Sequence, residues 1–283
     1  MSFRCQSCDG SDRTIVYRDL PDRFYALGSG FAYARCRACG LFQLDEVPEL
    51  GAYYKAYRVH ERESLAYRLL RRALIGSSYH FPEGTPGRVL DIGCGNGWYL
   101  EEMRSRGWRI AGFELDPEYA ATLASRLGAP IYTDPAAIEG PFDLVTFNFS
   151  FEHLDRPRGY LEMAHRCLAP GGELYLAVPN IEGREARLFQ ERWFHLDAPR
   201  HVALFGKQQL ARVLGEHGFE HVETRDLPVP TGFAGSVSYR LRGAFSTPIW
   251  YAAMAPGLVF CRIVRDGNFG ITARKAQATG STS

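Results

Sequence analysis

The chain has 283 residues, of which 46% are hydrophobic, and its 33 basic and 32 acidic side chains give a formal charge of +1 at pH 7. This length and composition can bury a substantial core, as one large domain or as one domain with a small appendage. Because the charges nearly balance, the chain is not a polycation that attracts nucleic acid by net charge alone.

Four cysteines near the N-terminus form two Cys-x-x-Cys knuckles, Cys5 with Cys8 and Cys36 with Cys39. Each knuckle puts two thiolates on one turn, and two such turns complete a tetrahedral zinc site. Four sulfur ligands leave no open position for water or substrate, so this zinc should stabilise the fold rather than catalyse. We predict a small zinc-ribbon module over residues 1–48.

The loop between the knuckles is longer than the usual spacing of zinc ribbons, which leaves room in segment 19–25 for an insert that reaches the active site. The sequence starts Met-Ser-Phe-Arg-Cys, with no apolar signal region, and its seven cysteines are not spaced as a secreted disulfide scaffold. We therefore expect a cytoplasmic protein.

Residues 49–84 are expected to form a linking helical segment. Within it, 60–79 carries leucines at helical spacing with arginines between them, namely Leu65, Leu69, Leu70 and Leu74 with Arg62, Arg68, Arg71 and Arg72. Such a basic amphipathic helix can lie on a membrane or an acidic partner. A helix that packs on the sheet before the first strand of an α/β fold is the interpretation we favour.

Residues 89–97, Val-Leu-Asp-Ile-Gly-Cys-Gly-Asn-Gly, predict an apolar strand that runs into an acidic residue and a glycine loop. The glycines let a ligand approach the backbone, and the helix expected from Trp98 points its N-terminus at it. The spacing Gly-x-Gly-x-Gly differs from the Gly-x-Gly-x-x-Gly of dinucleotide binders. A carboxylate at Asp91 suits a ligand with a cationic amine and a sulfonium.

This motif resembles the first motif of the class I S-adenosylmethionine-dependent methyltransferases, and further segments follow in the family's order. Residues 109–114 resemble the second strand, 142–149 the fourth and 167–178 the turn and fifth strand. The resemblance implies a Rossmann-like α/β sheet with an antiparallel final strand, and S-adenosylmethionine as cofactor.

The same resemblance implies the cofactor contacts. Glu114 stands where the family's carboxylate accepts both ribose hydroxyls, and Asp134 where the family often places a residue near the adenine amino group. The predicted cofactor-binding residues are Asp91, Gly93, Cys94, Gly95, Glu114, Leu115, Asp134 and Asn148.

Substrate chemistry should come from the segments that follow strands four and five, 148–155 and 193–201, because open α/β sheets present ligand contacts at these strand ends. Histidine can take a proton near neutral pH, and arginine can hold a carboxylate or phosphate through two hydrogen bonds. The candidates are His153, His195 and His201 for catalysis, with His153 the first choice of base and His195 the second, and Trp193 and Arg200 for substrate binding.

The N-terminal knuckles followed by Tyr53-Tyr-x-x-Tyr57 also resemble the zinc-bearing methyltransferases of sugar, surface-polysaccharide and natural-product pathways. This resemblance implies a small-molecule acceptor, methylated by in-line displacement at oxygen, nitrogen or carbon. The sequence leaves the acceptor atom and the oligomeric state open. One alternative is a nucleic-acid methyltransferase that uses the ribbon for recognition, which the balanced charge disfavours; the other is a non-catalytic cofactor-binding protein, which the intact glycine motif disfavours.

Residues 243–261 contain no charged side chain and are flanked by Arg242 and Arg262. The stretch is just long enough for a membrane span, but Pro248 and Pro256 interrupt the helix. A hydrophobic lid, a dimer surface or a peripheral membrane contact is favoured instead.

The last segment, 268–274, looks like the antiparallel final strand of the methyltransferase fold, placed beside 222–227. Residues 228–266 would then be an apolar insertion in a methyltransferase domain over 85–275. The remaining residues, 276–283, are expected to form a tail.

Overall fold

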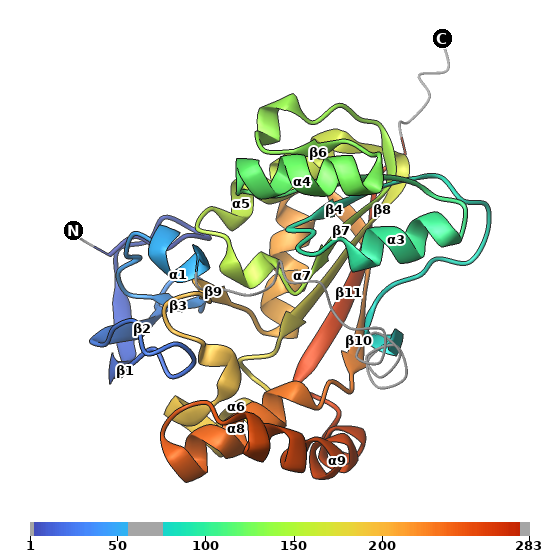
Figure 1. The fold of residues 1–283 in the computed structure, drawn as a ribbon. Coiled ribbons are helices and arrows are strands. Elements are labelled where there is room, and N and C mark those ends of the chain that lie inside the picture. The colour runs from blue at the N-terminus through green and yellow to red at the C-terminus, as the bar shows by residue number, and fades with distance from the viewer. Residues whose placement is uncertain (1–2, 56–75, 278–283) are drawn as a thin grey trace.

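The computed structural model describes residues 3–55 and 76–277 (Figure 1). The basic amphipathic helix predicted over 60–79 falls mostly outside the described residues. Of the linking segment, the structure describes the short helix α1 (Gly51–Lys55) and the 3-10 turn η2 (Gly76–Ser78).

A mixed sheet of seven strands forms the centre of the molecule, in the order β10-β11-β8-β7-β4-β5-β6 (Figure 1). Its strands are β4 (Arg88–Ile92), β5 (Arg109–Phe113), β6 (Ile131–Tyr132), β7 (Phe142–Asn148), β8 (Leu168–Pro179), β10 (Phe219–Leu227) and β11 (Asn268–Lys275). The pairs from β6 through β8 are parallel, whereas β11 runs antiparallel to both of its neighbours. The predicted Rossmann-like α/β fold with an antiparallel final strand is confirmed.

Helices cover both faces of this sheet, which explains why its central strands β4, β5 and β7 are mostly buried. Along β4, Val89 faces one core and Leu90 the other, since successive side chains of a strand point to opposite faces. The first face is covered by α3 (Trp98–Ser105) and α4 (Pro117–Leu127), and the second by α5 (Pro157–Cys167) and α7 (Lys207–Glu216).

The N-terminal residues form a second, smaller sheet of four strands. Its order is β1 (Arg13–Leu20), β2 (Phe31–Cys36), β3 (Phe42–Leu44) and β9 (Ala203–Leu204), and neighbouring strands are antiparallel. The edge strand β9 comes from the segment that follows β8, far along the chain. Figure 1 shows these strands beside the central sheet, and residues of both parts share one hydrophobic core. The predicted ribbon module is therefore joined to the larger domain.

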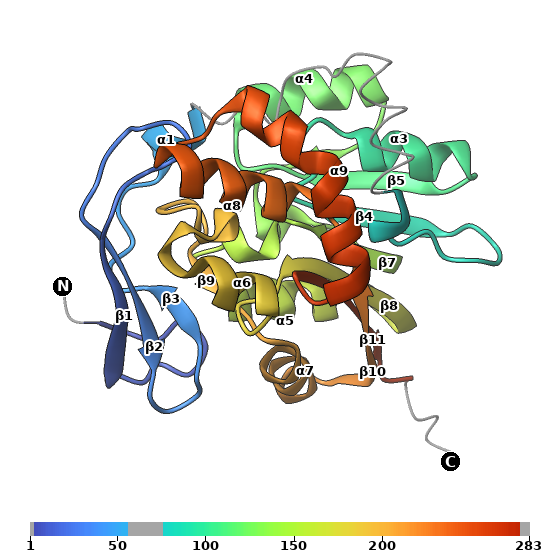
Figure 2. The same cartoon turned by 90° about the horizontal axis from the view of Figure 1, so that it is seen from below.

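Two helices, α8 (Thr231–Arg242) and α9 (Thr247–Val264), lie between β10 and β11 in the sequence. Figure 2 shows α9 running alongside α8 on the outside of the molecule. Within the described residues, α9 is the one helix long and apolar enough to cross a membrane by length and composition, and it contains Pro256. Its outer face exposes Tyr251, Val259 and Ile263, the last to 74%.

Shorter elements connect these layers near the carboxyl ends of the parallel strands. They are the helix α6 (Arg184–Phe189) and the 3-10 turns η3 (Pro135–Ala137), η4 (Phe151–His153), η5 (Gln190–Arg192) and η6 (Phe194–Leu196).

Candidate active site

The glycine loop joins β4 to α3 in a backbone conformation that requires glycine. Gly93 and Gly97 have φ values of +71° and +72°, in the left-handed region. A Cβ atom on Gly93 would lie 2.6 Å from the Cβ of Ser150, and one on Gly97 would lie 2.8 Å from a methyl carbon of Leu123. The two glycines therefore let neighbouring side chains pack closely against the loop. The loop lies in front of the N-terminus of α3, a position that favours the binding of a polar ligand.

Asp91 ends β4 beneath this loop and is buried. Its Oδ1 atom accepts hydrogen bonds from the hydroxyl of Thr146 (2.7 Å) and from the amide of Asn148 (3.0 Å) on β7. Burial raises the pKa of Asp91 to about 7, although these two hydrogen bonds act in the opposite direction. A cationic ligand placed nearby would favour the charged carboxylate.

The side-chain oxygen of Asn148 is buried and has no hydrogen-bond partner within the described part of the chain. The next residue, Phe149, has a φ of +55°, which is unusual for a bulky side chain. Backbone outliers of this kind gather at functional sites, so the end of β7 is a place where a ligand contact is expected.

Other predicted cofactor residues follow the neighbouring strands β5 and β6 or belong to the loop itself. Glu114 follows β5, and its carboxylate accepts a hydrogen bond from the backbone N–H of Leu115 (2.9 Å), whose side chain is 58% exposed. The carboxylate of Asp134 is exposed and caps η3 by accepting from the N–H of Ala136 (2.9 Å). Cys94 is buried, and burial raises the pKa of its thiol, as expected for a packing residue.

A second group of polar side chains lies beyond β7, in η4 and in the segment before β9. His153 donates its Nδ1 hydrogen to the carbonyl of Arg200 (3.1 Å), and the hydroxyl of Tyr54 donates to the carbonyl of His153 (3.1 Å). The rings of His153 and His201 have their centroids 4.5 Å apart. Burial lowers the pKa of each of these histidines to about 3, so both rings are neutral at pH 7.

Glu152 belongs to the same cluster but was not among the predicted residues. It is buried, and burial raises the pKa of its carboxyl to about 8. In the sequence, the signal for Glu152 was its place next to His153 after a predicted strand. The sequence does not show, however, that the Glu152 side chain points into the protein.

His195 and Trp193 lie under α8. The indole N–H of Trp193 donates to Glu185 (2.9 Å), and the carbonyl of His195 accepts from Nδ1 of His201 (2.7 Å). The Nε2 atom of His195 has no hydrogen-bond partner within the described residues. Trp193 is buried, and its only polar atom is bonded to Glu185. In this structure it therefore packs inside the protein and does not contact substrate.

Arg200 was predicted to bind substrate, but its guanidinium is fully buried and bonded within the protein. It donates to both oxygens of Asp22 (3.1 and 2.8 Å) and to both of Asp197 (2.9 and 2.5 Å). Because the guanidinium is bonded to two carboxylates, it has no pair of N–H groups left for a bidentate contact with substrate. Arg200 instead acts as a clamp that holds together the segments containing Asp22 and Asp197.

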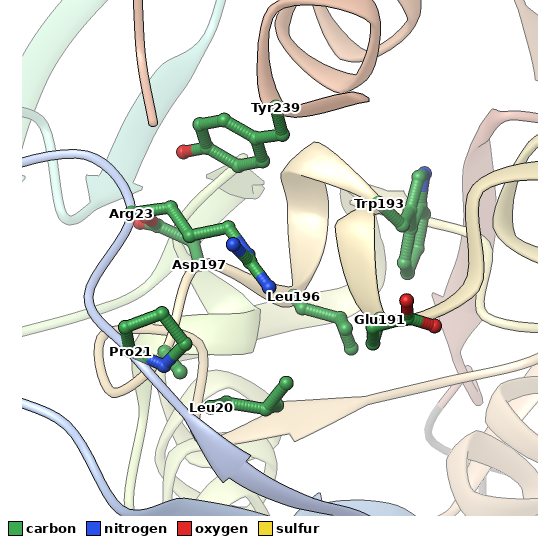
Figure 3. A pocket seen from close by; sticks show the side chains of 9 residues that line it. Leu20, Pro21, Arg23, Glu191, Trp193, Leu196, Asp197 and Tyr239 are labelled. Atoms are coloured by element: carbon green, nitrogen blue, oxygen red, sulfur yellow. The ribbon is translucent and has the colours of Figure 1, made fainter. Parts of the chain in front are cut away.

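Segment 19–25 reaches this clamp. Besides Asp22, it supplies Phe24. The centroid of the Phe24 ring lies 4.4 Å from that of Phe245, a residue of the loop that joins α8 to α9. Figure 3 shows the small cavity beside it, into which Arg23, Asp197 and Tyr239 project. Its volume of about 10 Å³ admits roughly one water molecule, too little for a substrate.

The four knuckle cysteines converge at the base of the smaller sheet. The sulfur atoms of Cys5 and Cys39 are 3.4 Å apart, those of Cys8 and Cys36 are 3.6 Å apart, and all four lie within 4.8 Å of one another. Tetrahedral zinc with bonds of about 2.3 Å separates its sulfur ligands by about 3.8 Å. The donor set and its spacing therefore fit such an ion.

Comparison with known proteins is consistent with this geometry. A family model described as a methyltransferase domain matches residues 58–224. The malonyl-[acyl-carrier protein] O-methyltransferase of Hahella chejuensis is 29% identical over 133 residues, which is 44% of this chain and 47% of that protein. A ubiquinone biosynthesis O-methyltransferase of a Caulobacter species is 36% identical over 103 residues, 33% of this chain and 41% of that protein. The chain thus spans less than half the length of these curated relatives.

Solved structures show the same fold at low sequence identity. One is from the complex between the Haloferax volcanii Trm112 methyltransferase activator and the putative methyltransferase, with a TM-score of 0.55, 17% identity and coverage of 82% of this chain and 100% of that chain. Another is phosphoethanolamine N-methyltransferase 2 of Haemonchus contortus with S-adenosyl-L-methionine, with a TM-score of 0.53, 16% identity and coverage of 83% and 62%.

Proposed function

Since the chain belongs to the methyltransferase-domain family and is an S-adenosylmethionine-dependent methyltransferase, we propose that its acceptor is a small molecule: a sugar, a glycan precursor or a natural-product intermediate. The observation that carries this proposal is that the glycine loop with Asp91 and the histidine cluster beyond β7 lie at the same edge of the sheet. Both curated relatives described above are named O-methyltransferases, which supports oxygen as the acceptor atom.

The residues at the glycine loop suit the cofactor. Asp91 and Glu114 supply negative charge, which favours a cationic ligand, and Asn148 offers a buried acceptor oxygen that lacks a partner within the described residues. Gly93 lets the loop pack closely against Ser150, where a Cβ atom would clash. When bound, S-adenosylmethionine supplies an electrophilic methyl group, so the protein mainly has to align the acceptor with it and exclude water.

We assign acceptor activation to the histidine cluster, with His153 first. His153 and His201 are neutral at pH 7, so each retains a nitrogen lone pair that can contact an acceptor hydroxyl. The hydrogen bond from His153 to the carbonyl of Arg200 fixes the direction of its ring. His195 is the second candidate, and Trp193 and Arg200 contribute by holding the surrounding segments in place.

We also propose that Cys5, Cys8, Cys36 and Cys39 bind a structural zinc ion in the cytoplasm. A reducing compartment would keep these thiols available to the metal. A metal cross-link between the two knuckles would stabilise this small sheet.

Methyl transfer should be measured with methyl-labelled S-adenosylmethionine against separate pools of sugar nucleotides, lipid-linked intermediates, phenolic compounds and RNA. Label in a small-molecule pool is the expected result. Label confined to RNA would refute the small-molecule acceptor and favour the nucleic-acid alternative, and tight cofactor binding without transfer to any pool would favour a non-catalytic protein.

The same assay tests the cluster. His153→Ala should lower turnover by about 100-fold or more, because that is the scale on which activating an acceptor contributes, while cofactor affinity stays the same. The control is His217→Ala, a histidine at the end of α7 that bonds the carbonyl of Val213. Near-normal turnover in His153→Ala would remove this residue from the reaction.

A further inference from the structure

The acceptor side of the site contains a set of side chains that can chelate a metal ion. Glu152, His153 and His201 each offer a carboxylate oxygen or a ring nitrogen, and these three atoms lie within 4.8 Å of one another. The first two residues belong to η4, and the third precedes β9. These residues are not shared with the cysteine site and form a separate cluster.

Both histidines are oriented as metal ligands usually are. Nδ1 of His201 lies 2.7 Å from the carbonyl oxygen of His195, and Nδ1 of His153 lies 3.1 Å from that of Arg200. A carbonyl oxygen can only accept, so Nδ1 carries the hydrogen on each ring and Nε2 carries the lone pair. Metal-bound histidines commonly donate their second ring N–H to such a carbonyl, which fixes the tautomer and the ring direction.

The carboxylate of Glu152 gives an independent indication of a missing ligand. The side chain is 2% exposed, and its Oε2 atom has no hydrogen-bond partner in the portion of the chain that the structure describes. Buried polar atoms without a partner are rare, and ionising a buried carboxyl group that has no partner is strongly unfavourable. A cation bound beside Oε2 would remove this penalty.

We propose that Glu152, His153 and His201 bind one divalent transition-metal ion, of the class of Mn²⁺, Fe²⁺ or Zn²⁺. Two neutral imidazoles and one carboxylate suit these ions, and three protein ligands leave coordination positions open to substrate. With bonds of about 2.1 Å, neighbouring ligand atoms of an octahedral ion are about 3 Å apart, so small side-chain shifts complete the site.

The use of this ion rests on the proposed function, and in it the bound ion takes the place of the free lone pairs of His153 and His201 as the group that contacts the acceptor. An acceptor hydroxyl binds at an open position, where the metal lowers its pKa and its proton passes to solvent water. The resulting oxygen forms a bond to the methyl carbon, the carbon–sulfur bond breaks, and its electron pair stays on sulfur, which becomes a neutral thioether. The metal keeps its oxidation state throughout.

The test is a titration with Mn²⁺ of the full chain carrying one zinc ion per chain, followed by the loss of the free-ion signal in electron paramagnetic resonance. Mn²⁺ prefers carboxylate and imidazole ligands and does not compete well for four thiolates. One Mn²⁺ per chain is expected. Glu152→Gln, which keeps the size of the side chain and removes its charge, should weaken binding tenfold or more. His217→Gln is the matched control, because its Nδ1 also lies 2.7 Å from a backbone carbonyl, yet it lies outside the cluster.

If Glu152→Gln lowers the stability of the protein, the effect of Mn²⁺ on thermal unfolding still reports whether the ion binds. Mn²⁺ should raise the melting temperature of the wild type and of His217→Gln, but not that of Glu152→Gln. The proposal is overturned if the wild type binds neither Mn²⁺ nor zinc beyond the four thiols, or if Glu152→Gln and His201→Gln bind as tightly as the wild type.

Activity measurements separate the site from its use. Full methylation by protein that lacks the second metal would overturn the role of the ion in acceptor activation. A failure to bind S-adenosylmethionine would refute the proposed function instead, since the Mn²⁺ titration does not depend on the cofactor.

Discussion

Replacing Arg200 with methionine should destabilise the protein strongly, even though the residue was first expected to bind substrate. Methionine keeps an unbranched apolar side chain in the space and removes the charge. The guanidinium has no exposed surface, and neither does Asp22, while Asp197 is 9% exposed. Removing one partner of a buried ion pair leaves an unpaired charge, which costs about 3–5 kcal/mol of the free energy of unfolding.

Urea unfolding at fixed zinc concentration, followed by tryptophan fluorescence, measures this loss. The matched control is Arg184→Met, because the ion pair of Arg184 with Asp266 has an N–O distance of 3.5 Å and a cation 70% exposed. An exposed pair of this kind contributes about 1 kcal/mol or less. Adding Asp22→Asn to Arg200→Met should recover part of the loss, since one of the two unpaired carboxylate charges disappears.

The pH dependence provides a further check. Burial acts to raise the pKa of Asp22, but the hydrogen bonds from Arg200 and from the backbone of Tyr25 and Leu27, together with the charge of Arg200, outweigh it, so the pKa in the folded protein is lowered. A carboxyl with a lowered pKa contributes stability above its ordinary pKa and loses it as pH falls through the folded value. In Arg200→Met, Asp22 protonates more readily, so the difference from the wild type should shrink in acid. An unchanged urea midpoint together with a raised Michaelis constant would refute this reasoning and restore Arg200 as a substrate ligand.

Further predictions concern the metal, the cofactor and the outer helix. Cys36→Ser should lose one zinc per chain and unfold more easily; elemental analysis showing unchanged zinc would contradict the ribbon. Asp91→Ala and Glu114→Ala should each weaken S-adenosylmethionine binding by about 1–3 kcal/mol in calorimetry, and unchanged affinity in both would exclude the expected contacts. Vesicles of anionic lipid should retain the protein through α9, and Ile263→Asp should release it; if the wild type does not bind, the exposed apolar face has another occupant.

The parts of the fold that the sequence predicts well are those set by neighbouring residues. The apolar runs 89–92 and 142–148 indicate buried parallel strands, and Gly93 and Gly97 mark a turn that only glycine adopts without strain. The antiparallel strand β11 follows from its own apolar pattern and from the resemblance to a known fold.

Contacts between distant residues were not predictable in this way. Asp22 and Arg200 are 178 positions apart, and neither sequence neighbourhood indicates that they pair. An arginine beside two histidines is typical both of a substrate site and of a buried clamp, and only the position of Asp22 distinguishes them. Likewise, Glu152 is one residue from His153, but whether its carboxyl faces solvent or the interior depends on the packing of the segment before β9.

The pairing of β3 with β9 has a consequence during synthesis of the protein. A ribosome that adds about 5–20 residues per second needs on the order of ten to thirty seconds between releasing β3 and releasing β9. Throughout that interval the edge of β3 has no partner strand, although all four cysteines have already been made. An unpaired edge can join a strand of another nascent chain. Early capture of zinc would hold the N-terminal strands compact while the rest of the polypeptide is being translated, so metal-starved cells should accumulate aggregates of this protein.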